Sequence, residues 1–411
     1  MKICVVGAGV IGLTTAYALA KRGHNVLVIE AHSQVAQEAS KANGAQLSYS
    51  YVAPLADAGV WQSLPGYLLK PDSPLRWRPR LDMQQWKWIS SFMVACTRHA
   101  SQKASVELLK LAFFSRDCLA TMQKELAMDF DFRTAGKLVM LSSEKMLQTA
   151  RRQIDFQQQY GCQQELLSAA ACMQIEPALA VANRHWAGGV YTPSEQVGDC
   201  AAFCSQLAGF LAQDSNVSLA FNTRVTGAVM SGGRVHALRC AQGDIVADAF
   251  VLANGVDSTQ TAATLDVSLS VYPLKGYSLT YETDDSKDLP TMSITDLAKK
   301  IVYARIGGRL RVAGKVEIVG NDKSLDARSW RGLADEAQQL FPVLAKHGDA
   351  LVPWAGLRPA TPTGIPIIGR SRLKNLYINA GHGALGWTLA CGSAEKLAGE
   401  MDGEVPAINH I

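Results

Sequence analysis

The pattern G-x-G-x-x-G occurs twice in this chain, at residues 7–12 near its start and at 381–386 near its end. The apolar stretch KICVV precedes the first copy, and residues with helical spacing follow it. Strand, glycine turn and helix in this order begin a dinucleotide-binding sheet. We expect Gly7 to make the tight turn, Gly9 to let a pyrophosphate approach the backbone, and Gly12 to let the helix pack closely against the strand.

Glu30 ends a second predicted strand, NVLVI, 18 residues after Gly12. A carboxylate at this place accepts hydrogen bonds from both ribose hydroxyls and repels a 2′-phosphate. The first unit therefore predicts an adenosine cofactor without that phosphate, which means FAD or NAD and not NADP.

The second glycine pattern follows a predicted strand at 374–380 and begins a predicted helix. Residues 387–411 contain no further apolar strand ending in an acid, so we do not expect a second nucleotide site. We expect one cofactor held from two sides, with this helix N-terminus near a group that becomes negative on reduction. The N1/C2-carbonyl edge of a flavin is such a group, whereas nicotinamide gains no comparable charge. FAD is therefore favoured over NAD.

A third nucleotide signal lies between the two glycine patterns. The stretch DAFVLANGVDS, 248–258, is a predicted buried strand ending at Asn254 and Gly255, and a predicted strand pair at 217–229 precedes it. Flavoenzymes of the glutathione-reductase type carry such a segment beneath the adenosine, so we expect the backbone of Val225 to contact adenine.

The chain has 411 residues, of which 48% are hydrophobic and 18% charged, and this length fits two or three domains with a large core. We predict an α/β fold with a Rossmann-like FAD-binding domain of the glutathione-reductase type at 1–50, 190–265 and 345–411. Residues 51–189 and 266–344 are predicted to form a discontinuous substrate domain. Alternating apolar and polar residues in this part predict an antiparallel sheet with helices on one face.

Several longer stretches resemble one family from end to end: VYPLKGYSLT at 271–280, WAGLRPATPTGIPIIGR at 354–370 and NAGHGALGWTLACGS at 379–393. The chain resembles the D-amino-acid oxidase and glycine-oxidase-like superfamily of FAD oxidoreductases. Within it, the chain is most similar to the small, FAD-bearing subunits of bacterial D-amino-acid dehydrogenases.

The resemblance implies a non-covalently bound FAD and oxidation of D-amino acids by hydride transfer from Cα to flavin N5. The product is an imino acid, which hydrolyses to a 2-oxo acid and ammonia. Electrons pass to a quinone or another respiratory acceptor, and the protein lies peripherally on the cytoplasmic side of the bacterial inner membrane. A secondary-amine dehydrogenase of the proline or hydroxyproline type, an amino-acid oxidase, and the flavin subunit of a larger complex remain alternatives.

The sequence departs from the family in the loop that lines the flavin. Close relatives read Ala-Asn-Ala-Gly there, whereas this chain reads Ala42-Asn43-Gly44-Ala45, and Tyr49 replaces a smaller residue. Both departures lie near the expected active site, so the preferred substrate stays open. The predicted cofactor-binding residues are Gly7, Gly9, Val10, Ile11, Gly12, Glu30, Ser40, Lys41, Ala42, Asn43, Gly44, Gln46, Val225, Asn254, Gly255, Gly356, Gly381, Gly383, Leu385, Gly386, Trp387 and Thr388.

The reaction needs a clamp for the substrate carboxylate, and an arginine fork meets a carboxylate with two parallel hydrogen bonds. Arg358 ends a predicted strand within WAGLRPATP and is the candidate, in line with the resemblance. Tyr277 is the candidate for supporting this clamp, and Tyr49 and Tyr51 are candidates for a lid over the substrate. His382 lies inside the second glycine turn, where it is either a base or a structural histidine.

Several classes of partner are excluded by composition. The net charge is +4 and the basic residues are spread along the chain, so no nucleic-acid surface is expected. Nine scattered cysteines without C-x-x-C or zinc spacing predict no metal site. We identify no signal peptide and no long apolar run, so the protein is expected to face the cytoplasm.

Residues 61–98 combine tryptophans with an excess of basic residues, as a membrane-surface segment does. The tryptophans are Trp61, Trp77, Trp86 and Trp88. A docking surface for a partner subunit, or within the chain, explains this composition equally well.

Overall fold

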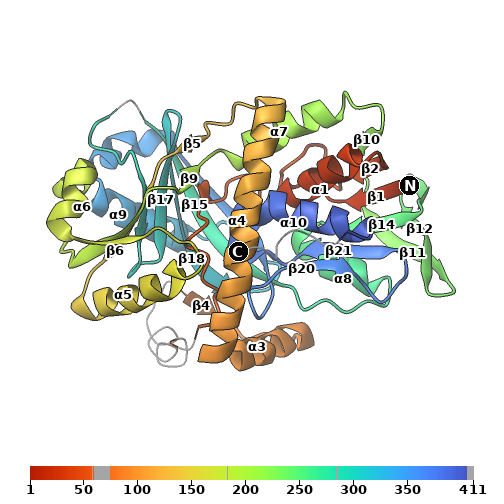
Figure 1. The fold of residues 1–411 in the computed structure, drawn as a ribbon, viewed down its shortest axis with the longest axis horizontal. Helices are drawn as coiled ribbons and strands as arrows, with labels where there is room; N and C mark the ends of the chain where they lie inside the picture. The colour runs from red at the N-terminus through yellow and green to blue at the C-terminus, as the bar shows by residue number, and fades with distance from the viewer. Residues whose placement is uncertain (58, 60–74, 183, 284–285, 405–411) are drawn as a thin grey trace.

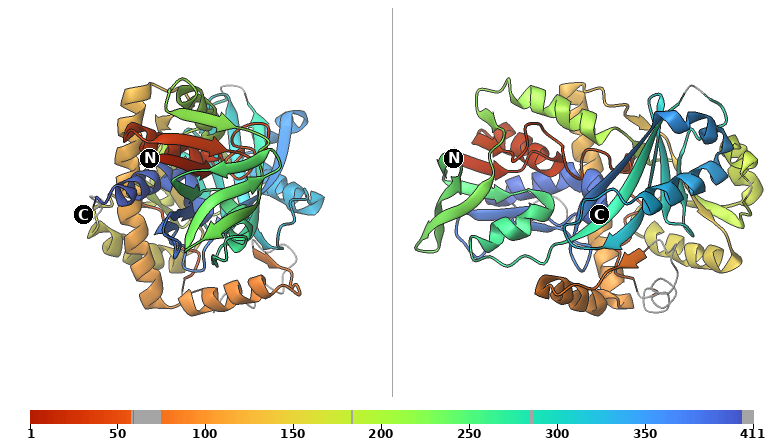
Figure 2. Two further views of the ribbon diagram at one scale, coloured as in Figure 1. Left: turned by 90° about the vertical axis from the view of Figure 1, so that its right-hand side faces the viewer. Right: turned by 180° about the vertical axis from the view of Figure 1, so that it is seen from behind.

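The computed structural model describes residues 1–57, 59, 75–182, 184–283 and 286–404. Two large sheets dominate it, a six-stranded sheet on the right of Figure 1 and a nine-stranded sheet on the left. The long helix α4 (Arg98–Leu126) crosses the front of this view, and the view from behind in Figure 2 shows the two sheets in reversed order. These findings confirm the predicted mixed α/β fold.

The six-stranded sheet contains the nucleotide-type elements. Its order is β10-β2-β1-β14-β21-β20, in which all neighbours are parallel except the edge strand β20. The bounds are β1 (Lys2–Val6), β2 (Asn25–Ile29), β10 (Val217–Ala220), β14 (Ala249–Leu252), β20 (Ile367–Arg370) and β21 (Leu376–Ala380). The strands are apolar on both faces because both faces are covered, as is usual for parallel sheets.

Alternate residues of β1 face opposite sides of the sheet, and different elements cover each side. Ile3 and Val5 pack in the cluster formed by α1 (Val10–Lys21), α4, α7 (Cys200–Leu211) and α10 (Gly386–Met401). Cys4 and Val6 pack on the other face, against α8 (Ser258–Ala263) and a small sheet of β11 (Val225–Ser231), β12 (Arg234–Cys240) and β13 (Gly243–Val246). The core of this half therefore lies on both sides of the parallel sheet.

The nine-stranded sheet has the order β19-β15-β18-β17-β16-β6-β8-β7, with β4 paired to β18. Neighbours are antiparallel except in the β16–β6 and β18–β4 pairs, which are parallel. The bounds are β4 (Leu75–Trp77), β6 (Lys137–Leu141), β7 (Glu165–Ser168), β8 (Gly188–Thr192), β15 (Tyr272–Glu282), β16 (Ser293–Asp296), β17 (Ile301–Ile306), β18 (Arg309–Ile318) and β19 (Leu351–Ala360).

Helices cover both faces of the nine-stranded sheet, and not one face as the sequence predicted. Leu138 and Met140 of β6 face the cluster that contains α9 (Ala327–Leu340) and α6 (Ala169–Ile175), whereas Val139 and Leu141 face α5 (Glu144–Gln158). The short strands β3 (Gln46–Leu47), β5 (Arg133–Thr134) and β9 (Gln196–Val197) form a separate three-stranded sheet. Short 3-10 helices occupy Pro177–Val181, Gly255–Asp257, Pro342–Ala350 and Gly383–Leu385.

The predicted domain division stays a prediction, and three elements depart from it. Strand β19 lies within the segment assigned to the FAD-binding domain, yet it is an edge of the nine-stranded sheet. Strand β8 joins the same sheet across the boundary at residue 190. Helix α4, assigned to the substrate domain, instead packs its buried face with α1 and α10. These pairings follow from apolar faces that only the tertiary structure brings together.

Within the predicted membrane-surface segment, the structure corrects the role of one tryptophan, Trp88. Trp61 lies outside the described residues, and Trp77 meets Trp86 edge-on at 5.5 Å between ring centroids. Trp88, in α3 (Met83–Ala95), is only 2% exposed, and its indole N–H donates to the Ala360 carbonyl at 2.8 Å. Its ring packs in the core and is not available to contact lipid.

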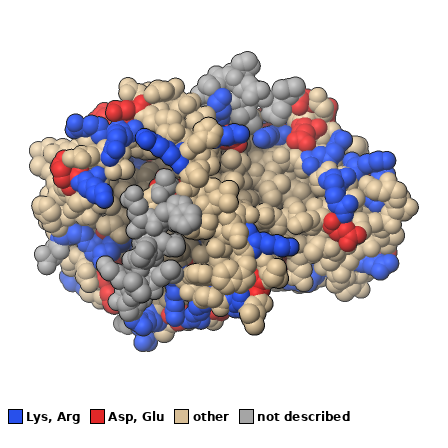
Figure 3. Space-filling view, turned by 90° about the horizontal axis from the view of Figure 1, so that it is seen from below, with Lys and Arg blue, Asp and Glu red and all other residues tan. Residues whose placement is uncertain are grey.

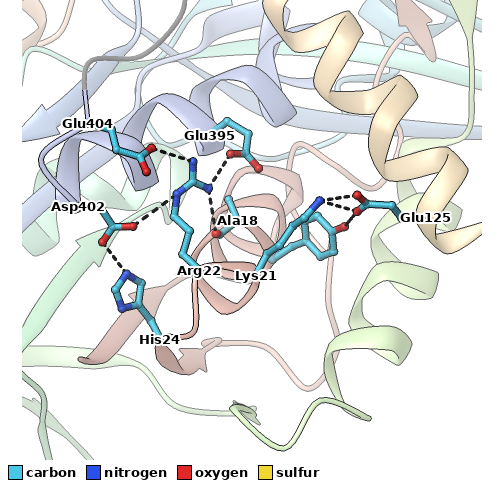
Figure 4. Close-up of polar contacts among 9 residues, drawn as sticks. Ala18, Lys21, Arg22, His24, Glu125, Glu395, Asp402 and Glu404 are labelled. Atoms are coloured by element: carbon cyan, nitrogen blue, oxygen red, sulfur yellow. Dashed lines mark hydrogen bonds and ion pairs between the residues drawn. The ribbon is translucent and has the colours of Figure 1, made fainter.

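Helices α1 and α10 are tied together at their C-terminal ends (Figure 4). Arg22 donates to the Glu395 carboxylate at 2.7 Å and lies 3.5 Å from carboxylates of Asp402 and Glu404. His24 Nε2 lies 2.9 Å from Asp402. On the other side Lys21 donates to Glu125 of α4 at 2.5 Å. These contacts connect α1, α4 and α10, three of the helices that cover the parallel sheet.

Gly392 of α10 lies directly against the backbone of α4. A Cβ at this position would lie 2.8 Å from the Cα of Ser115, which is backbone and cannot turn away. We expect Gly392→Ala to lower the free energy of unfolding by about 1–3 kcal/mol, the usual cost of overpacking. Denaturant titration of the FAD-loaded protein measures it.

Gly399→Ala is the matched control for this prediction. A Cβ at Gly399 meets only the Glu404 side chain at an ordinary 3.4 Å. Alanine there should stabilise the helix by about 0.5–1 kcal/mol, because glycine is the poorer helix former. Equal destabilisation by both changes would contradict the packing argument.

Candidate cofactor and substrate site

A single cavity of about 710 Å³ runs from the first glycine turn to the nine-stranded sheet. Both glycine turns border it, as do the third nucleotide segment and strands β15, β18 and β19. The described residues thus place all three predicted nucleotide signals at one site. A cavity of this size matches the range for cofactor and ligand sites.

The first glycine turn has a geometry that is suited to a pyrophosphate. Gly7 has φ +105°, and a Cβ there would lie 2.8 Å from the Cα of Asn254, so only glycine fits. Helix α1 begins without a capping side chain on its N-cap residue, Gly9, and without an acid in its first turn. Ser40 Oγ accepts the Val10 N–H at 3.0 Å. Such a helix N-terminus favours an anion.

Glu30 lies at the adenosine end of the cavity. One of its carboxylate oxygens accepts the Ala8 N–H at 2.7 Å, and the other accepts the His32 N–H at 2.9 Å. The backbone therefore fixes the carboxylate before a ribose binds. Val225, Asn254 and Gly255 border the same end, in agreement with the positions predicted for them.

The second glycine turn borders the opposite end. Gly383, Leu385, Gly386, Trp387 and Thr388 line the cavity, and the N-cap of α10 makes no side-chain capping bond. His382 also borders the cavity and is 2% exposed, and its buried Nε2 has no hydrogen-bond partner among the described residues.

Burial lowers the pKa of His382 to about 3, so the ring is neutral at physiological pH. A group so weakly basic is poorly suited to remove a proton at neutral pH. An orphaned nitrogen beside an uncapped helix N-terminus fits a bound polar ring system that supplies the missing partner.

The flavin loop, Ala42–Gln46, packs directly on the nine-stranded sheet. Ser278 Oγ donates to the Ala42 carbonyl at 2.6 Å, and Arg311 donates to the Asn43 carbonyl at 2.9 Å. Ala42, Asn43, Gly44 and Gln46 all border the cavity, as predicted. The loop therefore carries the backbone of the nucleotide half across to the strands of the other half.

Arg358 projects from β19 into the cavity. Its guanidinium lies over Gly276 of β15, where a Cβ would overlap it, and Nη1 donates to the Lys315 carbonyl on β18 at 3.2 Å. Within the described residues no carboxylate forms an ion pair with it. Burial lowers its pKa to about 10, so it stays charged at neutral pH. A half-buried cation that no described carboxylate neutralises is costly unless a ligand supplies the anion.

The three predicted tyrosines lie in different environments. Tyr51 borders the cavity, and its ring packs 4.8 Å from the Lys137 ammonium. Tyr277 borders the cavity only with part of its surface, because its hydroxyl donates to Glu317 at 3.1 Å and its ring packs under α9. Tyr49 is buried and does not line the cavity; its hydroxyl donates to Gln196 at 2.8 Å. The hydroxyls of Tyr277 and Tyr49 are therefore bonded to these partners and not to Arg358.

Three of the predicted cofactor residues do not line the cavity. Gly12 packs against the carbonyl of Gly7, and Gly381, with φ +86°, lies against the side chain of Thr361. Lys41 is exposed to solvent. The two glycines shape the turns from behind, as the spacing of the pattern requires, whereas Gly356 and the remaining predicted residues do border the cavity.

Lys137 was missed by the sequence analysis. It stands on β6, is 2% exposed and borders the cavity, and its ammonium donates to Gln46 Oε1 at 2.6 Å and Ser48 Oγ at 2.9 Å. Burial lowers its pKa to about 8. A lysine beginning the run KLVML is typical of a strand end, so no local pattern marks it.

A pyrophosphate cradle, a fixed ribose acceptor and a second glycine turn on one cavity are the features of an FAD enzyme. The model of the FAD dependent oxidoreductase family matches residues 2–400, and the chain belongs to this family. Its cofactor is FAD, and the orphaned His382 nitrogen and the glycine cradle fit that group.

The comparisons give relatives over the whole length. The chain is 44% identical to D-amino acid dehydrogenase 2 of Ralstonia nicotianae, covering 99% of this chain and 98% of that protein. It is also 44% identical to D-amino acid dehydrogenase 2 of Pseudomonas aeruginosa, covering 99% and 96%. Glycine oxidase of Geobacillus kaustophilus matches the fold with a TM-score of 0.78 at 21% identity, covering 98% and 95%.

The departure in the flavin loop has a measurable cost. Ala45 has φ +56°, a left-handed conformation that glycine adopts without strain. We expect Ala45→Gly to raise the free energy of unfolding by about 1 kcal/mol, after the larger entropy of the unfolded glycine chain is counted. Urea titration with saturating FAD measures the change.

Gly44→Ala is the companion variant. A Cβ at Gly44 would lie 3.2 Å from Val302 Cγ2, which is tight, so this change should destabilise the protein. If Ala45→Gly left the stability unchanged while Gly44→Ala lowered it, the loop would be limited by packing and not by backbone strain.

Proposed function

We propose that the protein oxidises D-amino acids to imino acids, which hydrolyse to 2-oxo acids and ammonia. The observation that carries this proposal is the Arg358 guanidinium, which borders the cavity and has no carboxylate partner among the described residues. Its planar fork matches the α-carboxylate common to all amino acids. The names of the relatives, D-amino acid dehydrogenases at 44% identity, support this choice of substrate and stereochemistry.

When bound, FAD supplies the acceptor for the hydride. Arg358 holds the carboxylate of the substrate, and the rigid β15–β19 pair fixes the direction of the guanidinium. Cations that border the cavity, Arg358 and Lys137, favour the neutral form of a bound amine, from which hydride leaves Cα. Because His382 is a weak base, we propose that the amine loses its proton to solvent as the substrate enters.

The first test is anaerobic. Purified protein is mixed with D-alanine, L-alanine, D-proline and cis-4-hydroxy-D-proline, and loss of the flavin absorption band is followed. We expect D-amino acids to bleach the band and L-alanine to leave it unchanged. Faster bleaching by the cyclic amines than by D-alanine would indicate a secondary-amine dehydrogenase, and reaction of the reduced protein with oxygen would indicate an oxidase.

Arg358→Met tests the clamp itself. We expect kcat/KM for D-alanine to fall by at least about a hundredfold, mostly through KM, because one partner of a buried charge pair is removed. Arg358→Lys should recover part of the loss, since it restores charge without the fork. Flavin content must stay that of the wild type; an unchanged KM in Arg358→Met would remove the clamp from the proposal.

We propose that the protein associates with the cytoplasmic face of the bacterial inner membrane and passes electrons to a quinone or another respiratory acceptor. Helix α3 supports this with one exposed apolar stripe, in which Met83 is 71%, Trp86 42% and Val94 76% exposed. Arg76, Arg78 and Arg80 precede the helix in sequence, and Lys87 lies within it. Figure 3 views this side from below and shows basic side chains spread among uncharged surface.

Apolar and basic residues together bind an anionic bilayer surface. Among the helices that the structure describes, none has the length and apolar character to cross a bilayer. A partner subunit that covers the same stripe is the competing proposal for this surface.

Sedimentation with lipid vesicles separates these proposals. We expect the protein to bind vesicles containing phosphatidylglycerol and to bind pure phosphatidylcholine weakly. The double change Met83→Ser and Trp86→Ser should lower binding by about tenfold or more, because two exposed apolar side chains that would enter the bilayer surface are lost. Flavin content should not change. Trp88 is excluded from this test because its replacement would disturb the core. Equal sedimentation of both proteins would overturn the membrane proposal.

A further inference from the structure

Lys137 is a second buried cation on the cavity, and the mechanism above does not require it to contact the substrate. We propose that it binds a second carboxylate, so that the preferred substrates are acidic D-amino acids, D-glutamate and D-aspartate. This inference rests on the proposed function and adds the substrate class.

The surroundings of Lys137 leave room for one more partner. An ammonium group has three N–H donors, and two of them are directed to Gln46 and Ser48. The third side of the nitrogen faces the Tyr51 ring at 4.8 Å, and Tyr51 also borders the cavity. Glu195 is the nearest buried acid that acts on the charge of Lys137, but its oxygens accept the backbone N–H groups of Tyr49 and Ser50. A ligand carboxylate would complete the shell.

Both cations border the cavity, and both reach toward the middle strands of the sheet. Arg358 reaches from β19 past β15 to the Lys315 carbonyl on β18. Lys137 reaches Gln46, whose amide nitrogen lies 3.4 Å and 3.3 Å from carbonyl oxygens of β16 and β17.

Neighbouring strands lie about 4.8 Å apart, and the carbonyls that these two side-chain networks reach include those of the adjacent strands β18 and β17. Two carboxylates joined by a short carbon chain, each with a hydrogen bond of about 2.9 Å at its end, are long enough to connect groups on neighbouring strands.

The charge of the cavity changes from one half to the other. On the side of the nine-stranded sheet, the described lining residues include the cations Lys137 and Arg358 and no Asp or Glu. The acidic lining residues, Glu30, Glu38 and Asp257, belong to the nucleotide half. One α-carboxylate does not balance this positive half, whereas a substrate with a second carboxylate does so better.

The test compares a substrate with its uncharged isostere. D-Glutamate and D-glutamine differ in charge but hardly in shape, so their kcat/KM ratio reports recognition of the side-chain carboxylate. We expect the wild type to prefer D-glutamate by at least about tenfold, the usual effect of one charge-assisted hydrogen bond. Lys137→Met should abolish this preference, and Lys137→Arg should retain most of it.

A binding measurement accompanies the kinetics. Glutarate and valerate carry two and one carboxylates without an amine, and their binding is read from the shift of the flavin spectrum. Glutarate should bind more tightly than valerate in the wild type but not in Lys137→Met. Lys145→Met, at an exposed position of α5, removes the same charge far from the cavity and should change neither comparison.

The outcomes separate the two proposals. If D-alanine and D-glutamine are oxidised as well as D-glutamate, or if Lys137→Met keeps the D-glutamate preference, the acidic substrate class is overturned and the amino-acid function stands. If no D-amino acid bleaches the flavin, the function fails, and the substrate class fails with it.

Discussion

The packing of α1 against α10 is the contact on which the site depends. Thr14 of α1 donates to the Ala390 carbonyl of α10 at 3.3 Å, and Asn379, which directly precedes the last residue of β21, donates to Thr15 at 3.0 Å. The ion pairs of Arg22 fix the far ends of the two helices. Because the helices are held side by side, their uncapped N-termini open into the same cavity, although nearly the whole chain separates them in sequence.

The other half of the site is a part of the nine-stranded sheet in which three adjacent strands carry glycines in place of larger residues. Gly276 and Gly356 are cross-strand partners on β15 and β19, and Gly314 lies on the adjacent β18. The missing Cβ atoms leave space for Trp354 over Gly356 and for the Arg358 guanidinium over Gly276. The flavin loop approaches the same sheet closely enough that Gly44 meets Val302. Backbone shape, and not a ring of catalytic acids, therefore defines the substrate side.

The sequence predicted the parts of the fold that depend on local pattern. Glycine turns, buried parallel strands and Glu30 lie where expected because strand, turn and helix follow each other within one unit. The tyrosines could not be placed, since a strand directs alternate residues to opposite faces and the sequence does not say which face is the cavity. For Tyr277, the sequence therefore left open which side of the sheet its hydroxyl would reach, and it bonds to Glu317. The sequence analysis missed Lys137 because its hydrogen-bond partners, Gln46 and Ser48, are some ninety residues away in the chain.

The guanidinium of Arg358 occupies the volume that any side chain at residue 276 would need. The guanidinium is the movable end of a long side chain, so a side chain at 276 would displace it. The two positions are therefore coupled, because the direction in which the arginine points depends on the absence of a Cβ at its neighbour. Evolution of this pocket toward other acids can thus act through residue 276 without any change to the arginine itself.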